Sequence, residues 1–462
     1  MTLKNSKKPK AIQDLLKNGS SKEYLYFLKF YHEADIAEQL ASLTENERSV
    51  FFKKVNLEVA TNVLEELDIE QQIDFISKLK TEAAAKFIEE MEPDDAVDLL
   101  EELSETNQVQ AEKIIDALPE KEKIEIQTLL SYDDGSAGSL MTSDYLSIPE
   151  DLTTLEALKQ IQNQNPPDSE VSFYIFIVSE SKKLIGYTTL KDLVFSSKNL
   201  KVKSIRHEHN IFVNHQQDQE EVAKLFQKYD MSVVPVIDEN EKLLGVITID
   251  DVVDVVVEEA NEDIYKLSGT ATDDEKKIMS TNIFTPIFYR IPWLIITIIG
   301  GIIASNIINS YSSIFNTPIF PLALSLSFIP LLMGLGGNVG NQSSAIIVRG
   351  LATGYINPKE SLKILLREVT IGIGIGIIIS GILFIVNKYF YTYPLIFSFI
   401  VTLSLFLNIL VAAFIGTTLP LLFHKLKIDP AIASAPFIST TLDIIGQLIY
   451  FFITISLVSN YS

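Results

Sequence analysis

The sequence predicts a multidomain membrane protein of mixed α and α/β architecture. An α-helical repeat solenoid, two α/β modules, a long acidic helix and five transmembrane helices follow one another in that order. Three observations support this prediction. Two different internal repeats occupy the first 257 residues, the acidic charge is concentrated before residue 281, and five long apolar segments follow. Repeats of this length indicate stacked structural units, and apolar segments of about 20 residues indicate bilayer crossings.

The first repeat is helical and covers the domain expected at residues 1–130. Short amphipathic patterns ADIAEQLASL, EVATNVLEEL and EAAAKFIEEM end at Leu43, Leu67 and Met91, which are 24 residues apart. The segment IIDALPEKEK is a weaker fourth copy, shifted by a few residues. Such units predict a small right-angled solenoid in which each repeat covers the apolar face of its neighbour.

The second repeat mixes strand and helix patterns. Runs such as VSFYIFIVS and MSVVPVID alternate with TTLEALKQIQ and EEVAKLFQKY. A Gly-x-x-Thr-x-x-Asp motif occurs twice, at Gly186 to Asp192 and at Gly245 to Asp251, 59 residues apart. This spacing predicts two βαββα modules in tandem, at residues 131–198 and 199–257.

A charged linker and a membrane domain complete the chain. Residues 252–280 are expected to form one long helix, and residues 258–283 are expected to link the modules to a transmembrane domain at 284–462. Each apolar segment in that domain is long enough to cross a bilayer. The expected spans are 287–308, 319–338, 368–387, 395–422 and 431–458.

The distribution of charge restricts both the partners and the orientation. Residues 281–462 contain four acidic and eight basic side chains, so the first 280 residues carry a formal net charge of −26. This charge argues against nucleic acid as a partner, because phosphate binding needs Lys and Arg, and it favours cations. Basic residues occur mainly in the loops 339–367 and 423–430, which predicts a cytoplasmic N-terminus and an outside C-terminus. MTLKNSKKPK does not resemble a signal peptide, and the absence of cysteine excludes thiolate metal sites.

Asp443 is the most informative candidate residue. It is the only charged residue in APFISTTLDIIGQLIYFFITISL, and a carboxylate at that depth costs about 2.5–3.5 kcal/mol on insertion scales. Small and polar residues at helical spacing extend a stripe from it in both directions: Pro436, Ser439, Thr440 and Gln447. The stripe favours an ion path. The alternative is a protonated Asp443 bonded to a neighbouring helix.

A glycine-rich segment is the second candidate. Gly334 to Ser344 reads GLGGNVGNQSS and follows Pro330, so we expect the helix to break or loosen here. Irregular backbone at membrane depth is tolerated where it lines a cavity or is buried in protein. Asn338 and Asn341 then present polar atoms to an ion or its water shell. Close helix packing through small residues is the alternative, and it explains the glycines but not the amides.

Acidic residues cluster in the soluble part as a third candidate site. Asp94 and Asp98 share one face of a helix that begins near Pro93. The linker helix has acidic residues three or four apart, where like charges repel: Asp251, Asp254, Glu258, Glu259, Glu262 and Asp263. A divalent cation between them would relieve the repulsion, and oxygen ligands suit Mg²⁺ or Ca²⁺. A solvated acidic face is the alternative for any single residue.

With GGNVGNQS, DPAIASAP and TTLDIIG, this order of segments closely resembles the MgtE magnesium transporters along essentially the whole chain. The paired modules resemble cystathionine-β-synthase (CBS) domains. The resemblance implies a homodimer in the inner cell membrane, with a pore on the two-fold axis. It implies that Asp443 from each subunit binds hydrated Mg²⁺, and that Asn338, Asn341, Ser439 and Thr440 line the pore. The linker then corresponds to a plug helix that closes the cytoplasmic mouth.

The resemblance also implies a cytoplasmic Mg²⁺ sensor that holds the closed state. Its positions by motif are Asp94 or Asp98, Asp218, Glu220, Asp251, Asp254, Glu259, Glu262 and Asp263. CBS domains often bind adenine nucleotides, and Thr248 and Asp251 are the expected ribose contacts. No GxxxxGK[ST] motif is present, so we expect a passive channel and no enzymatic activity. The alternatives are a transporter of Co²⁺, Mn²⁺ or Ca²⁺ and a membrane-anchored nucleotide sensor that transports nothing.

Overall fold

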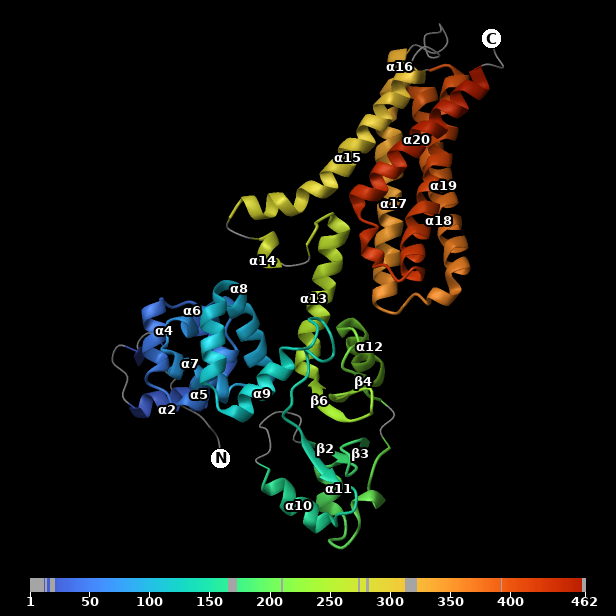
Figure 1. Cartoon of the computed structure of the whole chain (residues 1–462). Coiled ribbons are helices and arrows are strands. Elements are labelled where there is room, and N and C mark those ends of the chain that lie inside the picture. Colours follow the sequence, from blue (N-terminus) through green and yellow to red (C-terminus); the bar gives the residue numbers. More distant parts are fainter. Residues whose placement is uncertain are drawn as a thin grey trace, which may run out of the picture. The chain divides into compact units, whose positions relative to one another are not determined.

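The computed structural model describes residues 12, 15–16, 21–164, 173–208, 211–272, 275–279, 282–311, 322–391 and 393–458. The chain forms two compact units, Met1–Val255 and Val256–Ser462 (Figure 1). The first contains the helical repeats and the α/β modules, and the second contains the long apolar helices. The membrane protein fold predicted from the sequence, with helical repeats, paired modules and apolar helices, is confirmed.

Each 24-residue repeat folds as two short helices, after α2 (Ser21–Phe30). The first helices of the repeats begin 24 residues apart: α3 (Glu33–Ala41), α5 (Leu57–Glu65) and α7 (Thr81–Glu90). The second helices keep the same spacing: α4 (Glu45–Phe52), α6 (Ile69–Ser77) and α8 (Pro93–Ala117), with α9 (Glu120–Leu129) after them. Non-helical backbone at Asn107 interrupts α8, and α9 begins three residues later than a strict repeat requires. This interruption explains the shift of the fourth copy.

The two α/β modules have the predicted βαββα order. The first contains β1 (Leu146–Pro149), α10 (Thr154–Gln162), β2 (Tyr174–Val178), β3 (Leu184–Thr189) and α11 (Leu190–Phe195). The second contains β4 (Val213–Asn214), α12 (Gln219–Tyr229), β5 (Val233–Ile237), β6 (Leu243–Thr248) and α13 (Ile249–Ser268), and a short 3₁₀ helix, η2 (Val202–Ser204), precedes it. In each sheet the first two strands are parallel and the last two are antiparallel.

The repeated motif has a structural explanation in both modules. Thr142 pairs with Val246 of β6, and His207 pairs with Tyr187 of β3, so each last strand receives an extra segment from elsewhere in the chain. A Cβ at the preceding residue, Gly186 or Gly245, would overlap a backbone carbonyl of that segment. The motif threonine then caps the next helix: the Thr189 hydroxyl donates to Asp192 Oδ2 at 2.6 Å.

The acidic helix is shorter than the sequence suggested. The predicted helix over 252–280 ends at Ser268, because Gly269 adopts a left-handed φ of +80°. The amides of Gly269 and Thr270 bond to the carbonyls of Lys266 and Tyr265, which is the Schellman helix ending. The expected linker at 258–283 therefore contains a helix end, an irregular segment and the short helix α14 (Glu275–Ile278).

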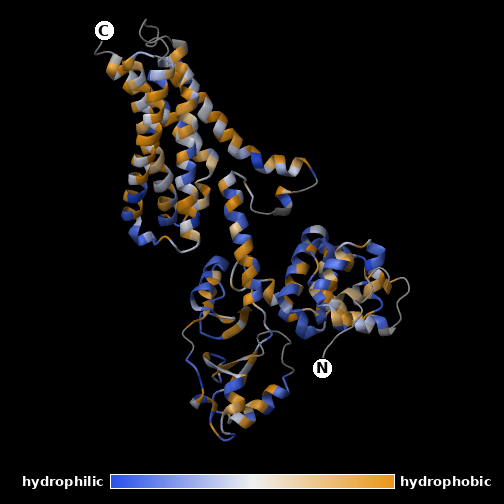
Figure 2. Ribbon diagram, turned by 180° about the vertical axis from the view of Figure 1, so that it is seen from behind, coloured by the Kyte–Doolittle hydropathy of each residue, from blue (hydrophilic) through white to orange (hydrophobic). Residues whose placement is uncertain are grey.

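The second unit is a bundle of long helices and is mostly hydrophobic (Figure 2). It contains α15 (Phe284–Tyr311), α16 (Leu322–Ser327), α17 (Ile329–Ala352), α18 (Ser361–Ile385), α19 (Leu395–Lys425) and α20 (Ala435–Val458). Short segments η4 (Pro358–Glu360), η5 (Val386–Phe390) and η6 (Pro430–Ile432) flank α18 and α19. In the described residues, α15, α18, α19 and α20 are long and apolar enough to cross a bilayer. The 24 residues of α17 are less apolar because they include glycines, amides and serines.

The glycine-rich segment does not break its helix, so that prediction is wrong. α17 runs continuously from Ile329 to Ala352, through the second half of the predicted span 319–338 and into the predicted loop 339–367. A Cβ at Gly340 would overlap Leu442 of α20, and one at Gly416 of α19 would overlap the Gly340 carbonyl. The glycines therefore permit close helix packing while the helical hydrogen bonds stay intact. The predicted loop 309–318 lies mostly outside the described residues.

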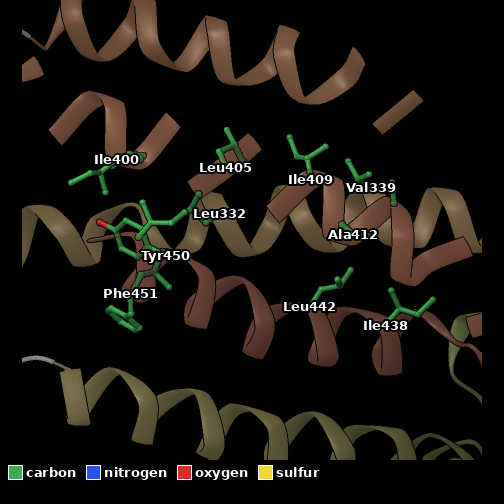
Figure 3. Close-up of a cluster of buried hydrophobic side chains, with 14 of the residues drawn as sticks. Leu332, Val339, Ile400, Leu405, Ile409, Ala412, Ile438, Leu442, Tyr450 and Phe451 are labelled. Atoms are coloured by element: carbon green, nitrogen blue, oxygen red, sulfur yellow. The ribbon is translucent and has the colours of Figure 1, made fainter. Parts of the chain in front are cut away.

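The centre of the bundle is a continuous apolar core. Side chains from α17, α19 and α20 interdigitate there, including Leu332, Ile409, Leu442 and Tyr450 (Figure 3). The Tyr450 hydroxyl donates to the Ser325 carbonyl at 3.0 Å, which satisfies the one polar atom of that buried side chain.

Candidate ion pathway and acidic cluster

Asp443 lies on the face of α20 that packs against α17. One turn before it, Ser439 Oγ accepts a hydrogen bond of 3.0 Å from Asn341 Nδ2, and one turn after it, Gln447 Nε2 lies 3.3 Å from Met333 Sδ. Residues four apart on a helix share a face, so Asp443 lies on the seam between these two contacts. Its carboxylate is partly exposed. Within the described residues no hydrogen bond or ion pair to it is found.

The packing of α17 on α20 places Asp443 well inside its span. The two helices run antiparallel, since Asn341 meets Ser439 while Met333 meets Gln447. A Cβ at Gly337, the ninth residue of the 24-residue helix α17, would lie 3.4 Å from Ser439 Oγ, so Gly337 packs against the residue one turn before Asp443. Asp443 is likewise the ninth residue of the 24-residue helix α20. The carboxylate therefore lies well inside the span.

An exposed polar strip of α17 borders the same seam. Gly334, Asn338 and Gln342 are exposed and four residues apart, so they form one line along the helix. A Cβ at Gly334 would meet no atom within 4 Å. Asn341 Oδ1 is buried and has no hydrogen-bond partner in the described part of the chain. The structure thus brings Asn341 and Ser439 together one turn from Asp443, and Asn338 lies on the exposed strip of α17.

Thr440 and the polar stripe of α20 have a second neighbour. The Thr440 methyl group packs against Gly300 of α15, where an added Cβ would overlap it. Pro436 packs in the same way against Gly269. Thr440 is therefore in contact with α15, and its contribution to a pore lining stays a prediction.

The soluble unit contains an acidic cluster at the start of α8. Glu65 Oε1 accepts a hydrogen bond from the Glu92 amide at 3.0 Å. Burial and the nearby carboxylates of Glu65 and Asp250 raise the pKa of Glu92 to about 7. Burial and Glu65 raise the pKa of Asp95 to about 8. Both side chains still reach solvent, so the surrounding protein removes only part of their hydration.

Asp94 and Asp251 belong to the same cluster. Burial and the charge of Asp251 raise the pKa of Asp94 well above its usual range, and Asp94 Oδ1 has no hydrogen-bond partner in the described ranges. Burial raises the pKa of Asp251 to about 6, although the Thr248 hydroxyl, which donates to Asp251 Oδ2 at 2.6 Å, opposes the shift. Asp254 adds a further negative charge beside Asp251. These carboxylates raise one another's pKa because protein replaces the water that would otherwise screen them.

Other sensor positions predicted from the sequence have local structural roles. Asp218 caps α12 by accepting from the Glu220 amide at 2.9 Å, and Glu220 pairs with Lys224 at 2.8 Å. Thr248 and Asp251 cap α13 in the same way that Thr189 and Asp192 cap α11. Asp98 lies on α8, and Glu259 and Asp263 lie on α13. Across the described ranges, no three His, Asp or Glu side chains are grouped closely enough to hold a metal ion.

The C-terminal end of α13 is attached to the membrane helices by an ion pair. Lys266 Nζ lies 2.8 Å from Asp429 Oδ2 and also pairs with Glu262 on its own helix. Asp429 Oδ1 meanwhile accepts from the Ala431 amide at 2.8 Å, in the connection between α19 and α20. A predicted sensor residue, Glu262, is thus neutralised by a lysine in this structure.

Comparison with known proteins identifies the family. Residues 329–453 match the family model described as a divalent cation transporter, residues 31–135 match the MgtE intracellular N domain, and residues 137–199 and 202–258 match the CBS domain. The chain is 33% identical over 443 residues to the magnesium transporter MgtE of Thermus thermophilus, covering 95% of this chain and 96% of that protein. The chain belongs to the MgtE family.

Further relatives of this MgtE-family chain agree with the assignment. It is 35% identical over 326 residues to the magnesium transporter MgtE of Bacillus subtilis, covering 71% of this chain and 70% of that protein. Among solved structures, the soluble part of a magnesium transporter matches with a TM-score of 0.50 at 29% identity, covering 54% of this chain and 96% of that one. The cytosolic domain of the Mg²⁺ channel MgtE in complex with ATP matches with a TM-score of 0.50 at 30% identity, covering 53% and 98%.

Two residues at these sites were missed by the sequence reasoning. Glu65 joins Glu92 in the acidic cluster although 27 residues separate them. In the membrane unit of this MgtE-family chain, Asn408 of α19 is buried and donates to the Leu332 carbonyl at 2.6 Å. It fits between Gly336 and Gly446, where an added Cβ would come within 3 Å of its amide. An amide inside the apolar helix α19 was the one available signal for it.

Proposed function

We propose that this MgtE-family chain conducts Mg²⁺ across the cell membrane along the seam between α17 and α20, with Asp443 as the central ligand. The main support is that Asp443 is partly exposed inside a span and has no partner in the described part of the chain. Mg²⁺ loses its water reluctantly and binds through one or two carboxylates. A lone carboxylate on the seam that the exposed polar strip of α17 borders suits a hydrated ion.

A homodimer would complete this pathway. The polar strip of α17 is exposed in the single chain, and an exposed polar strip within a lipid-spanning helix needs a polar or aqueous neighbour. A second copy related by a two-fold axis would present the same strip. Two Asp443 carboxylates would then face one hydrated cation, and their combined charge would match that of the ion.

The acidic cluster and α13 would regulate this flow. At low cytoplasmic Mg²⁺, repulsion among Glu92, Asp94, Asp95 and Asp251 disfavours the arrangement that brings them together. Bound Mg²⁺ relieves the repulsion, and each ion shifts the equilibrium by the difference in its affinity for the two states. An ion at 100 times its dissociation constant adds about 2.7 kcal/mol. Several ions acting together would seat the end of α13 as a plug and close the path.

The orientation follows from the loops of this multi-pass membrane protein. Arg349, Lys359 and Lys363 lie at one end of α17 and α18, and Lys425 and Lys427 lie between α19 and α20. These positions favour a cytoplasmic N-terminus and an outside C-terminus in the cell membrane. The membrane potential would then drive Mg²⁺ inward by about 2.3 kcal/mol per charge per 100 mV.

Adenine nucleotide is the second ligand we propose, at the CBS modules. The relative solved with ATP supports this, as do the two Thr and Asp pairs at the ends of β3 and β6. A CBS-based nucleotide sensor without transport is the alternative that this observation favours. The second alternative is transport of Co²⁺, Mn²⁺ or Ca²⁺, since a carboxylate and amides suit several hard cations.

Flux into liposomes tests the proposal. Asp443→Asn keeps the shape of the side chain and removes its charge, so we expect Mg²⁺ uptake to fall at least tenfold while the protein stays folded and dimeric. Glu360→Gln, at an exposed acid outside the seam, is the matched control and should transport normally. Normal uptake by Asp443→Asn would refute the pathway. Competition by Co²⁺, Mn²⁺ and Ca²⁺ gives the selectivity, and binding of ATP without metal flux would favour the nucleotide sensor.

A further inference from the structure

The first turns of α15 extend beyond what a membrane span requires. The helix has 28 residues, which at 1.5 Å per residue is about 42 Å, against a hydrocarbon core of about 30 Å. A straight helix would have to tilt by about 44° to bury its whole length, more than the range of about 0–40° seen for spans. α15 instead bends along its length (Figure 1) and contains Pro292. Proline removes a backbone donor and clashes with the preceding turn, so it accounts for the bend.

The residues after the bend are sufficient to cross the bilayer. Trp293 to Tyr311 is 19 residues, or about 28 Å of helix. Trp and Tyr are enriched at the two membrane interfaces, where their amphipathic rings lie at the level of the headgroups. The pair therefore indicates one interface at Trp293 and the other at Tyr311. The segment 284–291 then lies outside the hydrocarbon core, on the side of the linker.

One side of this segment is attached to the linker. The Trp293 Nε1 donates to the Thr270 carbonyl at 3.2 Å, and the Tyr289 carbonyl accepts from the Ala271 amide at 2.9 Å. Both linker residues lie within three residues of Ser268, the last residue of α13. The same face of α15 thus fixes the level of the end of α13 relative to the interface.

The opposite side of the segment is apolar and exposed. Phe284 and Phe288 are 73% and 70% exposed, and Ile287 and Ile291 are 50% and 42% exposed. Together with Ile283, at 67%, they recur at helical spacing and form one face. Contiguous apolar patches of this kind mark interaction surfaces. The exposed Arg290 beside them adds the positive charge typical of helices that lie on anionic lipid.

We propose that residues 283–291 dock in the headgroup region of the bilayer, with Phe284, Ile287, Phe288 and Ile291 inserted among the acyl chains. The occupant is lipid because the same helix enters the bilayer within one turn, at Trp293. A surface helix of this kind buries its apolar face at the boundary between headgroups and acyl chains. Through Thr270 and Ala271 it anchors the end of α13 at the membrane surface. This last step rests on the proposed role of α13 as a plug, whereas the lipid contact does not.

Trp293 is the only tryptophan of the chain, so fluorescence of the full chain in liposomes reports on this bend. The probes are lipids brominated near the headgroup or near the chain end, and acrylamide in the water. Wild-type Trp293 should be quenched severalfold more by bromine near the headgroup than by bromine at the chain end. Phe288→Trp in a Trp293→Phe background should behave in the same way. Phe195→Trp in that background, at a residue 84% exposed in the soluble unit, is the control and should respond to acrylamide alone.

Two results for the Phe288→Trp variant would overturn the proposal that residues 283–291 dock in the bilayer. If acrylamide quenches its introduced indole as strongly as that of the control, with no response to brominated lipid, the face is in water. If the introduced indole is protected from both quenchers, protein such as a second copy of the chain covers the face. Neither result depends on ion flux, so a failure of the transport assay leaves this test unaffected.

Discussion

Neutralising Asp95 should stabilise the soluble unit in the absence of divalent cations. Burial and Glu65 raise the pKa of Asp95 from 3.8 to about 8. At about 1.36 kcal/mol per pKa unit, ionising a carboxyl group that is fully shielded from solvent would lower the free energy of unfolding by about 6 kcal/mol. Because the Asp95 side chain is exposed by more than a third, solvent screening reduces this to about 1–2 kcal/mol. Asp95→Asn removes that penalty and keeps the shape of the side chain.

The expected shift in melting temperature follows from the size of the unit. A change of 1 kcal/mol moves the Tm of a domain of 150–250 residues by about 2–4 °C, so we expect Asp95→Asn to melt about 3–6 °C higher at pH 8 in EDTA. Calorimetry of the full chain in detergent measures it. Glu105→Gln is the matched control, because Glu105 is an exposed acid on the same helix. Mg²⁺ should stabilise the wild type more than Asp95→Asn.

The dependence on pH follows from the sign of the pKa shifts. A carboxyl group whose pKa is higher in the folded state favours folding below its unfolded pKa, and this contribution is lost as the pH rises through the folded value. For Glu92 and Asp95 the folded values are about 7 and about 8. Without metal, the wild type should therefore melt at a lower temperature at pH 8 than at pH 6, and Asp95→Asn should show a smaller difference. An equal or lower Tm for Asp95→Asn at pH 8 would refute the assigned repulsion.

Three further predictions concern α13 and the membrane helices. Neutralising Asp251, Glu259 and Asp263 together should leave the pore open at high Mg²⁺ in patch recordings, and unchanged closure would argue against a sensor role for α13. Lys266→Met removes the ion pair at the end of α13, so the Mg²⁺ concentration that closes the pore should change severalfold, and an identical closing curve would contradict a role for that pair. Gly340→Val places a side chain where α20 packs, so it should reduce the thermal stability of the membrane unit by several degrees, and a wild-type melting curve would contradict the close packing of α17.

Local patterns in the sequence were enough to predict the order of helical repeats, α/β modules and apolar helices. The 24-residue spacing of apolar positions predicted the helical repeats, and the repeated Gly-x-x-Thr-x-x-Asp motif predicted the two modules. Both succeed because helix and strand periodicity depend on neighbouring residues. Asp443 could be singled out in the same way, since an isolated carboxylate within an apolar span is costly wherever the helix packs.

The structural role of each glycine could not be predicted from the sequence. The segment around Gly337 was expected to loosen its helix, yet it packs against α20 as continuous helix, because the contact that makes glycine useful comes from another part of the sequence. Conversely, Gly269 ends α13 twelve residues before the predicted end at residue 280, through a left-handed conformation that the acidic pattern around it did not suggest.

The amino-acid sequence by itself determined which segments are helices, which are strands and which are apolar enough to enter a bilayer, because these properties are set by short-range spacing. Tertiary structure alone decided which charges meet. Glu65 joins Glu92, and Asn341 of α17 joins Ser439 of α20 one turn from Asp443, only when distant helices pack. Electrostatic repulsion and the loss of hydration depend on distance and surroundings in three dimensions, and neither quantity can be obtained from positions along the chain.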